Sequence, residues 1–109
     1  MSVTISISEE VARQLRDLSF EQADDLEQKV QSLVKAEHRR RLARYQLTDQ
    51  RLSQKYGMAF EEFERRQVTR QREYAWDVES DAIAWETAID GIQTMQEQMA
   101  SLDAVQDED

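Results

Sequence analysis

From Phe20 to Tyr56 the chain contains neither proline nor glycine, and most residues in this stretch favour helices. A straight helix of this length would be roughly 55 Å long, because each residue adds about 1.5 Å. Leu, Ile, Val and Phe account for only 23 of the 109 residues. A chain this poor in core residues cannot surround such a helix. We therefore expect it to bend or fold back near His38, or to lie against another chain.

The residues before this stretch predict a short strand and a short helix. Apolar and hydroxyl side chains alternate over Val3-Thr4-Ile5-Ser6-Ile7, as in a half-buried strand. Ser8 is a good N-cap, and the two glutamates that follow it suit the first turn of a helix. We expect that helix to end near Leu18. A capping box formed by Ser19 and Gln22 then predicts the start of the long helix at Phe20.

Gly57 predicts the end of the long helix. A glycine suits the left-handed position just after a helix, and Met58 can supply the accompanying apolar contact. A shorter helix is expected from Phe60 to roughly Arg72. The final helix should begin between Asp77 and Asp81, because apolar residues then recur every three or four positions at Val78, Ala82, Trp85, Ile89, Ile92, Met95, Met99 and Leu102.

The residue types argue against an enzyme and against a bound cofactor. The chain has no cysteine, no glycine-rich phosphate loop and a single histidine, His38, which we expect at the surface. Glu73, Asp77 and Asp81 could share a helix face, but carboxylates alone at this spacing are usually solvated rather than bound to metal. No apolar run of membrane length and no signal-peptide pattern occurs, which favours a cytoplasmic protein.

Basic residues gather in the middle of the long helix and offer two interpretations. The cluster contains Lys35, Arg39, Arg40, Arg41 and Arg44. Several cations on one face would suit the phosphates of a nucleic acid, where counterion release supplies affinity. The alternative is ion pairing with Glu37 and with the acidic C-terminal region. Both interpretations stay open at this stage.

The C-terminal region is acidic and aromatic. Residues 73–109 contain eleven acids and no lysine or arginine. Such a segment is either solvated and self-repelling or attracted to a basic partner. Both tryptophans lie here, and they could be core anchors packing on Phe60 and Phe63 or a surface that docks on a partner. The residues considered for partner binding are Phe60, Phe63, Tyr74, Trp76, Val78, Glu79, Trp85 and Glu86.

The order of strand, short helix and capped helix over residues 3–34 resembles the ribbon-helix-helix fold of dimeric bacterial regulators and antitoxins. The resemblance implies a dimer in which paired strands present Thr4 and Ser6 to DNA, with Lys35, Arg39 and Arg40 as further candidate contacts. Hydroxyls read bases ambiguously, and basic or amide side chains are usual at the strand positions. The expected dimer core consists of Val3, Ile5, Ile7, Val11, Leu15, Leu26 and Val30.

The stretch "KYGMAFEEFERR", followed by "YAWDVESDAIAWE", resembles small prokaryotic antitoxins of type II toxin–antitoxin pairs. The matching residues are Tyr56, Gly57, Met58, Phe60, Glu61, Glu62, Phe63, Trp76, Glu79 and Trp85. Ala59 departs from the pattern, which has serine there as a helix cap. The resemblance implies that the region after Gly57 binds a cognate toxin.

We therefore predict a mainly α protein with a short N-terminal strand and three regions. Residues 1–34 form a ribbon-helix-helix-like dimerisation region, 35–56 a helical spacer with the basic cluster, and 57–109 an acidic partner-binding region. The expected function is an antitoxin that neutralises a toxin, an RNase in the leading version, with possible DNA-binding autoregulation. The alternative is a helical DNA-binding regulator or an oligomeric scaffold module without a toxin partner.

Overall fold

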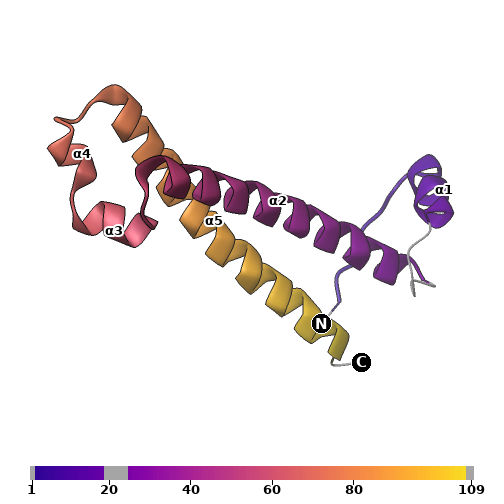
Figure 1. Cartoon of the computed structure of the whole chain (residues 1–109). Coiled ribbons are helices and arrows are strands. Elements are labelled where there is room, and N and C mark those ends of the chain that lie inside the picture. Colours follow the sequence, from indigo (N-terminus) through magenta and orange to yellow (C-terminus); the bar gives the residue numbers. More distant parts are fainter. Residues whose placement is uncertain (1, 19–24, 108–109) are drawn as a thin grey trace. The chain divides into compact units, whose positions relative to one another are not determined.

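The structure, a computed structural model, describes residues 2–18 and 25–107 (Figure 1). Its helices are α1 (Glu9–Asp17), α2 (Leu26–Tyr56), α3 (Phe60–Arg65), α4 (Val68–Gln71) and α5 (Trp76–Asp107). The chain divides into two compact units, residues 1–36 and 37–109, which we call the N-terminal unit and the C-terminal unit. Helix α2 contributes to both, and each unit is described by itself below.

The predicted N-terminal strand is not formed. The described residues contain no strand, and residues 2–8 have no regular structure. The mainly α prediction is confirmed, whereas the prediction of a short strand in a ribbon-helix-helix-like fold is wrong for this structure. The physical reason is that a strand is stabilised by hydrogen bonds to a second strand. No described segment supplies one, and the side chains of Val3, Ile5 and Ile7 remain exposed.

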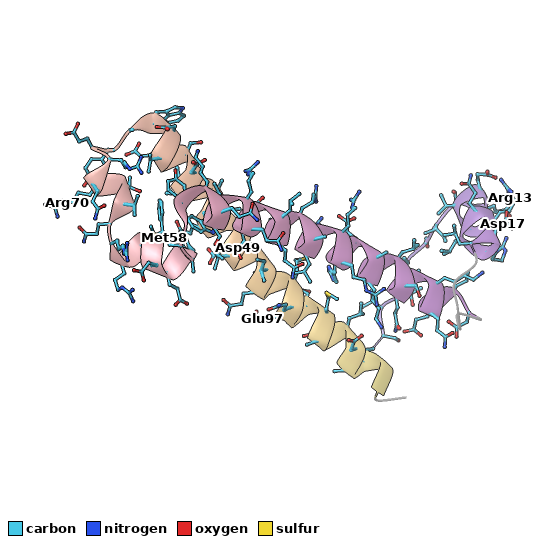
Figure 2. The ribbon with its side chains drawn as sticks, viewed as in Figure 1. Arg13, Asp17, Asp49, Met58, Arg70 and Glu97 are labelled. Atoms are coloured by element: carbon cyan, nitrogen blue, oxygen red, sulfur yellow. The ribbon has the colours of Figure 1, made fainter. Side chains whose placement is uncertain are left out.

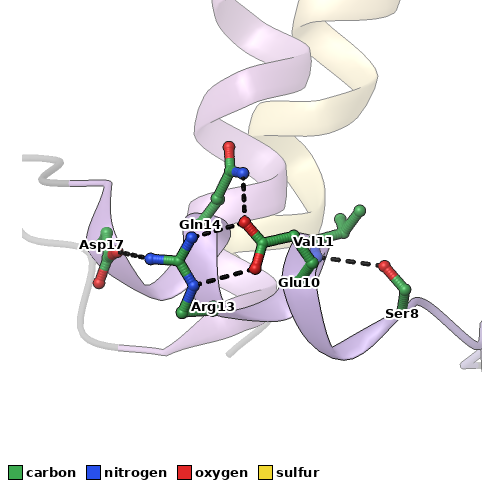
Figure 3. Close-up of polar contacts among 6 residues, drawn as sticks. All are labelled: Ser8, Glu10, Val11, Arg13, Gln14 and Asp17. Atoms are coloured by element: carbon green, nitrogen blue, oxygen red, sulfur yellow. Dashed lines mark hydrogen bonds and ion pairs between the residues drawn. The ribbon is translucent and has the colours of Figure 1, made fainter.

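Helix α1 forms where its capping residues predict it. The Ser8 hydroxyl accepts a hydrogen bond from the backbone N–H of Val11 at 3.2 Å (Figure 3). Along its exposed side, Arg13 donates to the carboxylates of Glu10 and Asp17 (Figure 3). Leu15 is the buried hydrophobic residue of this helix. These local contacts explain why so short a helix forms with little buried apolar surface.

Helix α2 is continuous from Leu26 to Tyr56, so the fold-back near His38, one of the alternatives considered for this stretch, is not formed. Its N-cap is Asp25, whose carboxylate accepts the backbone N–H of Gln28 at 2.8 Å. The predicted capping box and the start at Phe20 lie outside the described residues. No residue within α2 breaks the helical hydrogen bonds, which explains why the helix continues through the arginine cluster.

Gly57 ends α2 as predicted. Its φ angle is +68°, in the left-handed region that favours glycine. The backbone N–H groups of Gly57 and Met58 both donate to the carbonyl of Ser53, at 2.8 and 3.2 Å. The second of these bonds is the one that characterises a Schellman cap. Helix α3 then restarts at Phe60 after Ala59, which makes no side-chain cap hydrogen bond.

The helix expected from Phe60 to roughly Arg72 is interrupted, so α3 and α4 are separate. Gln67 adopts a left-handed conformation between them. In a straight helix Val68 would lie about 140° around the axis from Phe63. The turn at Gln67 instead brings both residues into the same buried cluster. Tertiary packing therefore outweighs local helix propensity at this point.

Helix α5 runs back beside the C-terminal half of α2 in the C-terminal unit (Figure 1). Two contacts define the antiparallel pairing. The Trp85 indole N–H donates to Asp49 at 2.8 Å, and Lys55 Nζ donates to Asp81 at 2.6 Å. The predicted apolar stripe of the final helix is confirmed, since its members are buried or half-buried. Helix α5 begins one residue before the predicted interval.

The core of the C-terminal unit is centred on Trp85, which is 0% exposed. The buried residues packed with it are Leu52, Phe63, Val68 and Val78. The ring of Trp85 lies 5.1 Å from that of Phe63 and 5.3 Å from that of Phe60, centroid to centroid. Tyr56 stacks on the same indole at 5.9 Å. Contacts between aromatic rings thus hold α2, α3 and α5 together in this unit.

Candidate partner-binding site

The two tryptophans of α5 have opposite environments. Trp76 is 79% exposed, whereas Trp85 is fully buried. They are nine residues apart, which is two and a half helical turns, so they lie on opposite sides of the helix. Trp85 is thus a core residue, and Trp76 is the tryptophan that is accessible to another molecule.

Trp76 belongs to a small apolar surface at the start of α5. Ile83 lies two turns further along the same side of the helix and is 65% exposed, and Tyr74, just before the helix, is 60% exposed. We call Tyr74, Trp76 and Ile83 the aromatic surface. Scattered apolar residues are normal on proteins, but exposed tryptophan and tyrosine dominate many protein–protein interfaces.

The charge around the aromatic surface has one sign. Helix α5 contains no basic residue, and its exposed acids include Asp77, Glu86 and Asp90. Asp81 is engaged in the fold instead: it accepts hydrogen bonds from Lys55 and from Tyr56, the latter at 2.7 Å. The hydrogen bond from Lys55 is the main reason why the pKa of Asp81 is lowered. The exposed carboxylates remain available to a positively charged surface.

A cleft of about 530 Å³ lies between α3, α4 and α5. Phe60, Phe63 and Val68 contribute its apolar lining. Its polar lining includes Glu64 from α3 and Glu86 from α5, and Tyr74 of the aromatic surface also borders it. The cleft and the aromatic surface therefore share a residue and form one continuous candidate site.

The residues that flank α4, which forms one wall of the cleft, have an unfavourable backbone conformation. Gln67 before α4 and Glu73 and Tyr74 after it have φ angles of 53°, 55° and 57°. A left-handed conformation costs a residue with a side chain roughly 1–2 kcal/mol. Hydrogen bonds from Glu73 N–H to the Arg70 carbonyl and from Tyr74 N–H to the Thr69 carbonyl help to hold the turn. Such strain is common at functional sites, which makes this wall a candidate for one.

The structure divides the residues predicted to bind a partner into two groups. Phe63, Val78 and Trp85 are buried in the core, and Phe60 packs against them. The contribution of the three buried side chains to binding is therefore to support the surface, whereas Phe60 also lines the cleft. The others are exposed or half-buried in the C-terminal unit: Tyr74, Trp76, Glu79 and Glu86.

The basic cluster is partly neutralised by its own helix. Arg40 and Arg41 both pair with Glu37, at 2.5 and 2.9 Å. This agrees with the ion-pairing interpretation for these two side chains. Arg39 is exposed and Lys35 is half-buried. Thr4 and Ser6, the other residues considered for DNA contact, are exposed as well.

The expected dimer core is mostly solvent-exposed in the single chain. Leu15 is buried, whereas the other members are exposed: Val3, Ile5, Ile7, Val11, Leu26 and Val30. In a single chain these exposed residues therefore lack the packing that a core provides.

No group of His, Asp or Glu that could hold a metal ion occurs among the described residues. His38 is half-buried rather than at the surface as predicted, and its Nδ1 is enclosed without a hydrogen-bond partner. None of the described helices is long and apolar enough to cross a membrane.

Ile83 and Glu64 were missed by the sequence reasoning. Ile83 stands outside the apolar stripe that contains Val78, Ala82 and Trp85. It follows Trp76 by seven residues, which is about two helical turns, and this spacing could have placed both residues on one side of the helix. Glu64 gave no signal, because only the turn at Gln67 brings α4 round to form a cleft beside it.

Comparison with known proteins supplies no relative. No protein-family model, curated protein or solved structure matches the chain. The functional argument therefore depends on the geometry of the site and on the sequence resemblances described above.

Proposed function

We propose that the protein is an antitoxin-like inhibitor that binds a basic partner protein through the C-terminal unit. The observation that carries the proposal is the exposed Trp76 beside Tyr74 and Ile83, on a helix whose charged residues are all acidic. Aromatic residues supply contact area, and the uncompensated acids attract a basic surface and speed association with it. The resemblance of residues 52–95 to type II antitoxins supports the same function.

An RNase is the toxin class that fits the charge best. Enzymes that cleave RNA bind its phosphates in a basic groove, and the exposed carboxylates of α5 could occupy such a groove in their place. Inhibition would then be competitive with RNA. A positive surface of this kind would also explain why exposed carboxylates such as Asp77, Glu86 and Asp90 form no ion pair within the described part of the chain.

A homodimer formed by the N-terminal unit is part of the proposal. Its motivation is the exposed apolar set Val3, Ile5, Ile7, Val11, Leu18, Leu26, Val30, Leu33 and Val34. Leu15 is the buried hydrophobic residue in the described part of this unit. Association with a second copy would remove much of this apolar surface from water.

Co-expression with the product of the adjacent gene tests the function, since toxin and antitoxin are normally encoded together. We expect the full chain to protect the host and Trp76→Ala to weaken the purified complex roughly 30-fold, about 2 kcal/mol, as for an interface hot spot. Leu47→Ala is the matched control, because Leu47 is as exposed as Ile83, at 65%, but lies on α2. Undiminished binding by Trp76→Ala, or no complex with the full chain, would overturn the proposal.

A further inference from the structure

Two carboxylates border the cleft without a partner. Glu64 comes from α3 and Glu86 from α5, and both side chains are exposed. Within the described part of the chain neither accepts a hydrogen bond or forms an ion pair. The neighbouring Glu62 differs, since it pairs with Arg65 and Arg66. Two helices thus present free negative charge to the same hollow.

Aromatic residues contribute to the lining of the cleft beside these carboxylates. Phe60 and Phe63 stack at 6.3 Å between ring centroids, and Tyr74 borders the same cleft. Faces of aromatic rings attract cations, and the guanidinium group of arginine also stacks on them. An aromatic lining with carboxylates at its edge is complementary to a long cationic side chain.

Arg70 is the one basic residue among those that line the cleft. It extends on the outer side of α4 (Figure 2), where its Nη1 lies 3.4 Å from the Gln67 side-chain oxygen. The charges lining the cleft are therefore two negative and one positive, and the positive one is directed outward. The charge balance inside the cleft favours a cation.

We propose that this cleft receives an arginine side chain of the bound protein, with its guanidinium between Glu64 and Glu86 and its stem on Phe60, which Phe63 supports from the core. Arginine suits the site better than lysine because its planar group can both stack on a ring and donate paired hydrogen bonds to carboxylates. The inference rests on the proposed function, and it names the anchor by which the acidic unit recognises its partner.

The test uses N-acetyl-arginine amide as a probe, titrated into the isotopically labelled full chain and followed by NMR. We expect saturable shift changes at the Glu64 and Glu86 carboxyl groups and at the Tyr74 ring, with an affinity on the order of millimolar for so small a ligand. The citrulline analogue has the same shape without the charge and should cause no saturable change.

Paired variants separate the cleft from general acidic attraction. Glu64→Gln with Glu86→Gln should weaken probe binding at least tenfold, and both positions are exposed, so the fold should persist. Glu61→Gln with Glu97→Gln removes the same charge from exposed positions outside the cleft and should leave probe binding unchanged (Glu97 is labelled in Figure 2). Equal responses to citrulline, or equal losses in both double variants, would overturn the inference.

The inference and the proposed function can fail separately. If the probe binds at the cleft but the adjacent gene product is not bound, the cleft assignment stands and the antitoxin-like function falls. If complex formation depends on Trp76 but the probe does not bind, the function stands and the arginine anchor is wrong.

Discussion

At the residue scale, hydrogen bonds among partly buried polar groups stabilise the C-terminal unit beside its aromatic core. Tyr56 is half-buried against Trp85, and its hydroxyl donates to Asp81, which also accepts from Lys55. Burial, and secondly the hydrogen bond to Asp81, raises the pKa of Tyr56 to about 12 from its ordinary value of 10.0. The folded state therefore favours the neutral phenol more strongly than the unfolded state does.

This shift predicts a loss of stability at alkaline pH. Below pH 10 the phenol is neutral in both states, and its contribution is fully present. As the pH rises from 10 to about 12, the unfolded chain loses the phenol proton first, so the free energy of unfolding falls. Urea unfolding across this range should show a shallower decline for Tyr56→Phe than for the wild type.

Tyr74→Phe is the control for that experiment, because Tyr74 is exposed at 60%. It should keep the wild-type decline. Identical pH profiles for Tyr56→Phe and the wild type would contradict the assignment of the alkaline loss to Tyr56.

At the element scale, the pairing of α2 with α5 depends on a small residue at one contact. A Cβ atom added at Gly91 would lie 2.5 Å from two ring carbons of Tyr45. Glycine inside a helix costs about 1 kcal/mol relative to alanine, so Gly91 weakens α5 locally. The close approach of the Tyr45 ring explains why a residue without a side chain occupies this position.

Gly91→Ala should therefore destabilise the protein although it favours helix formation. Overpacking costs typically 1–3 kcal/mol, which exceeds the gain of about 1 kcal/mol in helix propensity. We expect the free energy of unfolding in urea to fall by about 1 kcal/mol. In a Tyr45→Ala background the same substitution should become stabilising, because the ring is gone. An unchanged sign in the two backgrounds would show that the Tyr45 contact does not control this position.

At the scale of the whole molecule, the two units differ in how much apolar surface they bury. The C-terminal unit encloses Trp85 and Leu52 almost completely, whereas the N-terminal unit leaves most of its apolar residues exposed. A single copy therefore holds one well-packed unit and one that gains from association.

Light scattering against protein concentration tests that association. We expect the wild type to form dimers and Val30→Asp to shift the dimer–monomer equilibrium at least tenfold toward monomers, because a buried unpaired carboxylate opposes the contact. Ala43→Asp, an equally helical and exposed position of α2 in the C-terminal unit, should keep the wild-type mass. A wild type that is monomeric at every concentration would exclude the dimer.

Much of the helical organisation could be predicted from the sequence, because its signals are local. The Ser8 cap, the Gly57 stop and the three- and four-residue spacing of the α5 stripe act through contacts within one or two turns, and the structure confirms all three. The strand at Val3 failed because pairing needs a second strand, which no local pattern provides.

The sequence by itself determined where most helices begin and end and which side of α5 is apolar, since backbone hydrogen bonding and periodicity depend on near neighbours. Only the tertiary structure decided that Trp85 is buried while Trp76 is exposed, that the chain turns at Gln67, and that Glu64 and Glu86 border one cleft. These outcomes depend on packing between residues far apart in the chain. Core packing outweighed helix propensity at Gln67, and that turn shaped the candidate site.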